Sequence, residues 1–311
     1  MHHLSDGGHR GYTRAMALSP DRPIGPLEAS ILQDLAPVFS VRAVPAGGTT
    51  FRVLEGGSGS PLVLIHGRGL ASTTWAPWLL PLARSHRVLA FDLPGFGATP
   101  AGQLRPGGAE EGLDYFVEPV AALLSALQLE RPVLIGHSLG GFVSVELALR
   151  RAVDPARLVL IGCMGVGPQM SYAARAFFLA GPERVARAAG RSVYSRISPL
   201  PDHAWGRRIS ALEYEIASVP GGRSIPAIAF NRLFPLVGPQ LHRLGRLPEI
   251  AAPALLVWGE DDVVFPAPVA LVAAAAMPRG RALVLPGLGH SPHMQEPERV
   301  LAEVERFLGE R

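Results

Sequence analysis

Short runs of apolar residues, each bounded by glycine or proline, recur in the first and last thirds of the chain. Most runs are continuous rather than alternating, which is typical of strands buried on both faces of a sheet. They predict strands over residues 50–54, 62–66, 88–92, 133–136, 158–162, 255–258 and 282–285. Segments with apolar residues three and four positions apart predict helices between them, over residues 113–129, 140–150 and 298–308. This alternation predicts an α/β protein with a mostly parallel central sheet flanked by helices.

The alternation is interrupted once, between residues 164 and 251. This stretch has helical spacing over residues 177–189 and 204–217, several prolines, and no run resembling a buried strand. A structureless loop of that length is unusual in a compact domain. We therefore expect a helical lid at 164–251, inserted between the two parts of one core, 41–163 and 252–311. Residues 1–40, which begin with a polar segment rich in glycine, proline and histidine, are expected to form an N-terminal extension.

The charge of the chain gives little indication of a partner. The net charge is +3, every basic residue other than histidine is arginine, and the arginines are scattered. Nucleic-acid binding would need a concentrated basic face, so we expect no nucleic-acid partner. One modest concentration is expected to be a solvated helical surface, with an acidic partner or a membrane surface as the alternative. It comprises Arg175, Arg184, Arg187, Arg191, Arg196, Arg207 and Arg208.

Cysteine content and hydropathy favour a soluble protein. Cys163 is the only cysteine, so an internal disulfide is excluded. No stretch approaches the roughly 18 uninterrupted apolar residues of a membrane span, and we expect no stable membrane insertion. Residues 1–40 do not follow the pattern of a secretory signal. A cytoplasmic location is the resulting expectation, and the sequence does not indicate an oligomeric state.

The strongest chemical signal is the sequence Gly-His-Ser-Leu-Gly at residues 136–140. It follows one predicted strand directly and precedes a predicted helix. A serine held in so sharp a turn needs small residues on both sides, and the turn projects its hydroxyl above the sheet. Ser138 is therefore the candidate nucleophile.

A serine nucleophile needs a base to take its proton and a carboxylate to orient that base. Both residue types follow later strands: Gly259 is followed by Glu260, Asp261 and Asp262, and residues 282–285 are followed by a turn that ends in His290. Open α/β sheets build their sites at this carboxyl edge. His290 is the candidate base, and the acid is one of the three carboxylates.

Three other histidines could compete with His290. His66 and His137 flank the glycine turns, and a structural role in lining or supporting the site is expected for each. His293 lies one helical turn beyond His290, and we expect it to be a surface or packing residue.

Five motifs in this order resemble the α/β-hydrolase superfamily over about residues 48–165 and 252–311. They are His66-Gly67-Arg68-Gly69, the turn from Asp92 to Gly97, the serine turn, Trp258-Gly259 with Asp262 and Pro266, and Gly289-His290 with Glu296-Pro297. The resemblance implies the α/β-hydrolase fold with an inserted helical lid. These motifs specify the fold far better than the substrate.

The resemblance also implies residue roles. The family spacing, with two residues between glycine and the acid and then a proline four positions on, selects Asp262; Asp261 remains the alternative. The oxyanion donors would be the backbone N–H groups of Leu139 and Arg68. The Arg68 side chain is expected to be salt-bridged or solvent-facing, with a substrate carboxylate as the alternative. The turn that begins at Asp92 is expected to have a structural role, mainly in shaping the adjoining loop.

The implied activity is that of a carboxylesterase or lipase-like serine hydrolase acting through an acyl-enzyme on Ser138, without cofactor or metal. An aspartate nucleophile, as in epoxide hydrolases and haloalkane dehalogenases, is absent. C–C bond hydrolases, acyltransferases and cofactor-free haloperoxidases use the same triad and stay open. Aromatic residues of the lid segment favour hydrophobic acyl or aryl esters as the small-molecule substrate, unless they only hold the lid to the core. They are Phe177, Phe178, Tyr194, Trp205, Tyr214, Phe230 and Phe234, with Leu179 and Leu233.

A non-catalytic ligand-binding protein is the alternative from a different class. Such proteins share the fold but usually lack residues of the triad. Candidates for all three positions are present here, which favours an enzyme.

Overall fold

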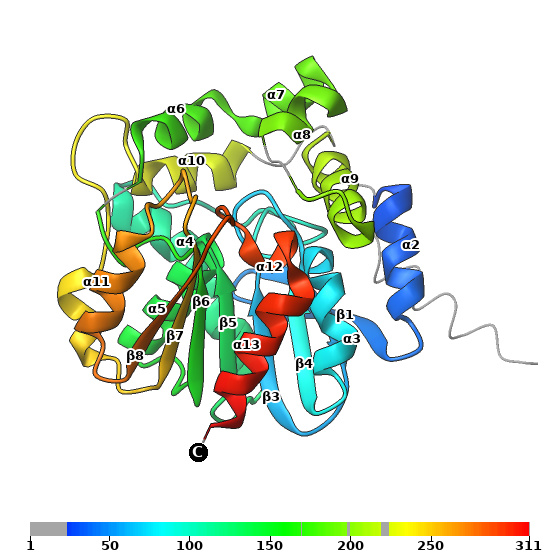
Figure 1. Ribbon diagram of the computed structural model, residues 1–311, viewed down its shortest axis with the longest axis horizontal. Helices are drawn as coiled ribbons and strands as arrows, with labels where there is room; N and C mark the ends of the chain where they lie inside the picture. Colours follow the sequence, from blue (N-terminus) through cyan, green and yellow to red (C-terminus); the bar gives the residue numbers. More distant parts are fainter. Residues whose placement is uncertain (1–23, 169, 198–199, 219–223, 311) are drawn as a thin grey trace, which may run out of the picture.

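One mixed sheet forms the centre of the molecule (Figure 1). The computed structural model describes residues 24–168, 170–197, 200–218 and 224–310. Within them, eight strands lie in the order β1-β2-β4-β3-β5-β6-β7-β8; β2 is antiparallel to β1 and β4, and the other neighbours are parallel. The strands are β1 (Phe39–Ala46), β2 (Thr49–Gly56), β3 (Ser60–Ile65), β4 (His86–Phe91), β5 (Val133–His137), β6 (Arg157–Ile161), β7 (Ala254–Gly259) and β8 (Gly280–Leu285). The predicted mostly parallel sheet is confirmed.

Helices cover both faces of the sheet, because the buried strands are apolar on both faces. In β3, Leu62 and Leu64 face one apolar core, whereas Val63 and Ile65 face the other. The first core is completed by α2 (Pro26–Leu35), η1 (Ser72–Trp75), α3 (Ala76–Leu82), α12 (Pro292–Gln295) and α13 (Pro297–Gly309). The second is completed by α4 (Ala109–Ala126), α5 (Leu139–Leu149), η2 (Leu244–Glu249) and α11 (Pro268–Ala276).

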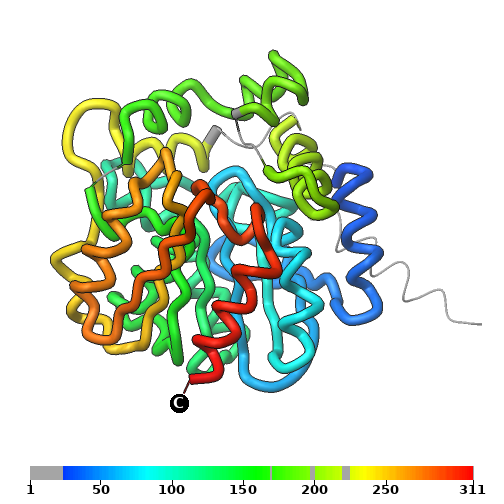
Figure 2. The backbone as a smooth tube through the Cα atoms, in the orientation of Figure 1, coloured from blue at the N-terminus to red at the C-terminus, as the bar shows by residue number. Residues whose placement is uncertain are grey.

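The segment between β6 and β7 is helical and lies over the carboxyl ends of the parallel strands, at the top of Figure 1. Its helices are α6 (Tyr172–Ala180), α7 (Pro182–Ala189), α8 (Arg191–Ile197), α9 (Ala204–Ser218) and α10 (Ser224–Leu233). The segment leaves and rejoins the core at neighbouring points, as the trace in Figure 2 shows. There the N–H of Arg243 donates to the carbonyl of Gly165 at 2.7 Å.

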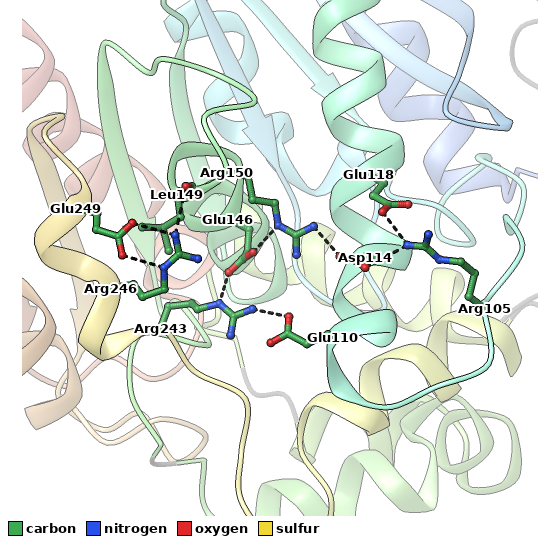
Figure 3. A network of polar contacts seen from close by, with 10 residues as sticks. All are labelled: Arg105, Glu110, Asp114, Glu118, Glu146, Leu149, Arg150, Arg243, Arg246 and Glu249. Atoms are coloured by element: carbon green, nitrogen blue, oxygen red, sulfur yellow. Dashed lines mark hydrogen bonds and ion pairs between the residues drawn. The ribbon is translucent and has the colours of Figure 1, made fainter.

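A network of ion pairs fixes the point where this segment rejoins the core (Figure 3). Glu146 of α5 is only 1% exposed, and its carboxylate lies between Arg150, at 2.6 Å, and Arg243, at 2.5 Å. Arg243 also pairs with Glu110 of α4. On the exposed side, Arg150 reaches Asp114. Arg243, near the end of this segment, is thus held to α5, the helix that begins beside Ser138.

The structure includes part of the stretch predicted as an N-terminal extension. Residues 1–23 lie outside the described residues, whereas α2 packs on the core through Ile31, Leu32 and Leu35. Glu28, which is 3% exposed, pairs with Arg52 of β2 at 2.5 Å. Helix α2 is therefore an integral part of the domain's packing.

The arginine concentration of the inserted segment is not uniformly solvated. Arg175 is buried and donates to the backbone carbonyls of Met170 and Pro235, so the prediction of a solvated side chain is wrong for this residue. The buried carbonyls supply the acceptors that its guanidinium requires. Arg184 and Arg187 of α7 are exposed, as expected. In the described part of the chain, no helix is long and apolar enough to cross a bilayer.

Candidate active site

Ser138 lies in a strained turn between β5 and α5. Its φ and ψ are 51° and −112°, a combination that non-glycine residues rarely adopt. The turn is held because the N–H of Ser138 donates to the carbonyl of Ile161 at 2.9 Å, and its own carbonyl accepts from Phe142 and Met164. The side chain is left at the carboxyl edge of the sheet, where the residue is 7% exposed.

Two glycines make this turn possible through close backbone contacts. A methyl group on Gly140 would lie 2.1 Å from the carbonyl oxygen of Ile65, and one on Gly136 would lie 2.4 Å from that of Gly140. No side chain fits at such distances. The Gly-x-Ser-x-Gly pattern is therefore a packing requirement at this site.

Two hydrogen bonds join Ser138, His290 and Asp262 in a line. The Oγ of Ser138 lies 3.1 Å from Nε2 of His290, and Nδ1 of His290 lies 2.9 Å from Oδ2 of Asp262. The second oxygen of Asp262 accepts the N–H groups of Val264 and Phe265 at 2.8 and 2.9 Å. The carboxylate is thereby fixed in orientation, so that His290 keeps Nε2 directed at the serine.

The other two carboxylates of the run do not take part in this line. Glu260 and Asp261 are exposed, whereas Asp262 is 5% exposed. The N–H of Asp261 donates to the carbonyl of Leu288, which holds the β7 loop against the loop that carries His290. Of the three acids considered, the structure brings only Asp262 to His290.

His66 has the structural role expected of it. Its Nε2 accepts the N–H of Leu93 at 2.9 Å, and its Nδ1 is 2.7 Å from the carbonyl of Gly67. Both ring nitrogens are therefore engaged with backbone groups. The Oδ1 of Asp92 accepts the N–H of Ser72 at 2.7 Å. His66 and Asp92 thus shape the loop that precedes η1, as predicted for Asp92.

His137 and His293 form a buried aromatic cluster next to His290. The His137 ring lies 5.1 Å from that of His290 and 4.5 Å from that of His293, and His293 packs on Trp75 at 4.6 Å. Nε2 of His137 is 3.2 Å from the carbonyl of His290, so it also supports the loop backbone. Burial lowers the pKa of both histidines, with a further contribution from neighbouring histidine rings. The expected supporting role of His137 and packing role of His293 both agree with these contacts.

Comparison with known proteins agrees with this architecture. The sequence profile of the Alpha/beta hydrolase family matches residues 62–304. The chain belongs to this family. The fold and superfamily expected from the five sequence motifs are therefore confirmed.

Relatives within the α/β hydrolase family carry different activities in their names. Rv2715, an uncharacterized protein of Mycobacterium tuberculosis, is 33% identical over 89% of this chain and 83% of its own length. A 2-hydroxy-6-oxo-2,4-heptadienoate hydrolase of Pseudomonas putida is 30% identical over 86% of this chain and 95% of its own. The solved structure of the esterase RhEst1 from Rhodococcus is 26% identical, with a TM-score of 0.68 over 86% of this chain and 98% of that one.

One residue of this α/β hydrolase was not identified from the sequence. Glu183 of α7 lies at 3.0 and 3.3 Å from the guanidinium of Arg68, whose side chain is 3% exposed. The salt bridge expected for Arg68 is thus present, with its partner on the inserted segment. A single acid in an arginine-rich helix offers no sequence signal that would have revealed this contact.

The described part of the chain shows no side-chain arrangement typical of a metal site. Over those residues, no group of three or more histidine, cysteine, aspartate or glutamate side chains is arranged to hold a metal ion. Cys163 is buried against α5, and burial raises the pKa of its thiol well above the usual value. The side chains that hydrogen-bond to one another at the sheet edge are those of Ser138, His290 and Asp262.

Proposed function

We propose that this α/β hydrolase cleaves carboxylic esters, with Ser138 as nucleophile, His290 as general base and Asp262 as the acid that orients the base. The observation that carries the proposal is the line of two hydrogen bonds, 3.1 Å from Ser138 to His290 and 2.9 Å from His290 to Asp262. A serine hydroxyl is a weak nucleophile until a positioned base takes its proton. The geometry supplies that base and an oriented carboxylate for the resulting imidazolium.

The proposed reaction has two stages. Oγ of Ser138 attacks the ester carbonyl while Nε2 of His290 takes the hydroxyl proton. The imidazolium then gives this proton to the departing alcohol, which leaves the acyl group on Ser138. Water, deprotonated by His290, attacks the acyl group, and loss of the carboxylic acid restores the serine. The scheme uses no cofactor.

The backbone N–H groups of Leu139 and Arg68 are the proposed oxyanion donors. Leu139 is the first residue of α5, so its N–H has no acceptor within the helix and lies at the positive end of the helix dipole. A methyl group on Gly67 would lie 3.3 Å from Cβ of Ser138, which puts the Gly67 backbone, and with it the Arg68 peptide, beside the nucleophile. These positions suit donors to a charge that develops on the carbonyl oxygen.

The proposed substrates are small esters with a hydrophobic acyl or aryl group, and residues 164–251 are the proposed lid above them. Successive ring contacts run from Phe178 through Phe230 and Phe234 to Phe265, with centroids 5.1 to 6.2 Å apart, and Phe265 lies 5.6 Å from His290. Phe230, Phe234 and Phe265 are only 1–2% exposed, so they hold the segment to the core, and the apolar surroundings that they give the base suit an apolar group there. Other aromatic residues of the segment, such as Tyr194 and Tyr214, pack on each other.

A C–C bond hydrolase is the second candidate, because one relative is named as a 2-hydroxy-6-oxo-2,4-heptadienoate hydrolase. Such a substrate carries a carboxylate. Arg68, the arginine next to the proposed oxyanion position, is already paired with Glu183. This pairing favours an uncharged ester over an anionic dienoate. Acyl transfer and cofactor-free haloperoxidation use the same triad and differ in what attacks the acyl group.

Two measurements test the proposal. A fluorophosphonate probe is expected to label the wild-type protein and to fail on Ser138→Ala, and Asp262→Asn is expected to lower kcat on p-nitrophenyl esters by about 10³-fold or more. The folded state of each variant is checked by circular dichroism. Absence of Ser138-dependent labelling in folded wild-type protein would favour a non-catalytic ligand-binding role.

Substrate class is decided with three parallel assays. They use p-nitrophenyl esters of increasing chain length, a 2-hydroxy-6-oxo-dienoate, and an added alcohol as competing acceptor. Turnover of the longer esters with release of free acid supports the proposal. Turnover of the dienoate with no ester hydrolysis would replace it with C–C hydrolysis, and preferential transfer to the alcohol would indicate an acyltransferase.

A further inference from the structure

The side chain of Arg68 joins the loop beside the nucleophile to the inserted helices. Its guanidinium nitrogens lie 3.0 and 3.3 Å from the two carboxylate oxygens of Glu183 on α7. The side chains are 3% and 9% exposed, so the pair is almost entirely removed from water. A paired contact of this kind fixes orientation as well as distance, which a single hydrogen bond does not.

Two aromatic rings flank the same guanidinium. Its central carbon lies 5.2 Å from the ring centroid of Phe178 on α6 and 5.3 Å from that of Phe230 on α10. A planar guanidinium can stack on rings while its edge pairs with a carboxylate, whereas a lysine ammonium cannot reproduce both. One residue of the core therefore contacts α6, α7 and α10 at once.

The backbone of Arg68 belongs to the loop that the proposed mechanism uses. The loop follows β3, passes beside Ser138 at Gly67, and is held at its far end by the Ser72 N–H bond to Asp92. Gly69, directly after Arg68, has φ of +77° and no side chain to fix it. The buried side chain of Arg68 thus anchors the part of the loop that contains the backbone N–H of Arg68.

We infer that Arg68 is a positioning residue: its ion pair with Glu183 couples the placement of helices α6, α7 and α10 to correct placement of the Arg68 N–H. This inference rests on the proposed ester hydrolysis. An oxyanion donor acts only from the right distance and direction, so a loop that is free to shift loses stabilisation of the transition state and not of the bound ester. Rupture of the pair should consequently lower kcat more than it raises KM.

The test compares variants of both partners on one p-nitrophenyl ester. Arg68→Met is expected to lower kcat by about 10- to 100-fold with KM changing by less than about threefold, and Glu183→Gln to lower kcat by about 5- to 10-fold. Arg68→Lys should recover part of the loss. The double variant should be no slower than Arg68→Met alone, because the two residues act as one unit. A trifluoromethyl ketone, whose adduct with Ser138 carries an oxyanion, should lose affinity in parallel with kcat.

Arg208→Met is the matched control. Arg208 of α9 also pairs across to the core, with the exposed Asp34 of α2, but away from the loop. Its kcat should stay within about twofold of the wild type, since exposed pairs contribute little.

The outcomes separate this inference from the function on which it rests. Absence of Ser138-dependent ester turnover in wild-type protein would overturn both. Wild-type kcat in folded Arg68→Met and Glu183→Gln would overturn the inference alone, as would an effect confined to KM. Should Arg68→Met fail to fold, the kcat of Glu183→Gln and its inhibitor affinity decide the question.

Discussion

The rings of His137 and His293 pack against each other in the protein interior, with 4.5 Å between their centroids. Burial lowers the pKa of His137 well below its usual value and that of His293 to about 3, and the neighbouring His290 adds to both shifts. Trp75 and Trp78 close the other side of His293. Both histidines therefore favour the neutral form in the folded protein, whereas in the unfolded chain they are protonated at pH 5.

Stability should consequently decrease as the pH falls from 6.5 to 5. The unfolded chain binds the additional protons in this window, so acid favours unfolding by about 1.4 kcal/mol per pH unit for each histidine. His293→Phe is expected to reduce the slope of the unfolding free energy against pH by about 1.4 kcal/mol per pH unit in this window, with little change above pH 7. Urea unfolding at pH 7.5, 6.5, 5.5 and 5.0 measures this slope for the variant and the wild type. Equal slopes in the variant and the wild type would show that His293 does not contribute.

The buried charges of Arg52, Glu28 and Asp92 predict an asymmetric response to substitution. Burial alone would raise the pKa of Asp92, but Arg52, His66 and the Ser72 N–H lower it, so the carboxylate stays charged. Arg52→Met leaves two buried carboxylates without their cation and should cost about 3–5 kcal/mol. Glu28→Gln keeps the Arg52–Asp92 pair and should cost about 1 kcal/mol. Chemical denaturation measures both, and equal losses would contradict this account.

The network in Figure 3 contains a partly buried and an exposed arginine that can be compared directly. Arg243 pairs with Glu146, which is 1% exposed, so Arg243→Met should cost about 1–3 kcal/mol. Arg105 pairs with Asp114 and Glu118 in solvent, and Arg105→Met should cost less than about 1 kcal/mol. Thermal unfolding at low and high salt distinguishes them, since only the exposed pair should weaken with salt. A reversed order would refute the assignment.

Gly140 and Gly245 should respond very differently to a methyl group. Gly140→Ala would place the methyl 2.1 Å from a backbone oxygen of β3, and we expect a loss of more than about 3 kcal/mol or failure to fold. Around Gly245 nothing lies within 4 Å of the new methyl, so Gly245→Ala should be neutral or stabilising by up to about 1 kcal/mol. Melting temperatures of the two variants provide the comparison.

Two substitutions at Ser138, one that keeps Cβ and one that removes it, test whether the backbone is strained there. Ser138→Gly permits φ of 51° without cost, whereas Ser138→Ala keeps a Cβ in that conformation. Ser138→Gly should therefore be more stable than Ser138→Ala by about 1 kcal/mol. Both variants should lack the proposed activity, so the difference is measured by urea unfolding. Greater stability of Ser138→Ala would exclude strain at this position.

The central strands and the candidate residues Ser138, Asp262 and His290 could be predicted because each stands in a recognisable local sequence pattern. Leu62 to Ile65 is apolar on both faces, and the two glycines around Ser138 are demanded by backbone contacts that nothing else satisfies. The family spacing selected Asp262 over Asp261 as the candidate acid. Asp262 is buried and Asp261 is exposed, which agrees with that selection.

The remaining features depend on contacts that are distant in sequence. Strand β1 was missed because it is an edge strand: of its residues only Phe39 is fully buried, and Pro45 interrupts the pattern. Helix α2 was missed although Pro26 stands at its first position, since its entry is capped by the carboxylate of Glu215, 188 residues away from Leu27. The salt bridge between Arg68 and Glu183 joins residues 115 positions apart, so no local sequence pattern indicates it.

The hydrogen bond from the Arg243 N–H to the Gly165 carbonyl holds the first residues of the inserted segment next to residues near its end. The pairing of β6 with β7 therefore does not depend on how many residues lie between them. A change in the number of residues between 165 and 243 need not disturb the register of β6 and β7. Under the proposed function, a change within this one continuous segment would alter the groups above Ser138 while Ser138, His290 and Asp262 keep their places at the sheet edge.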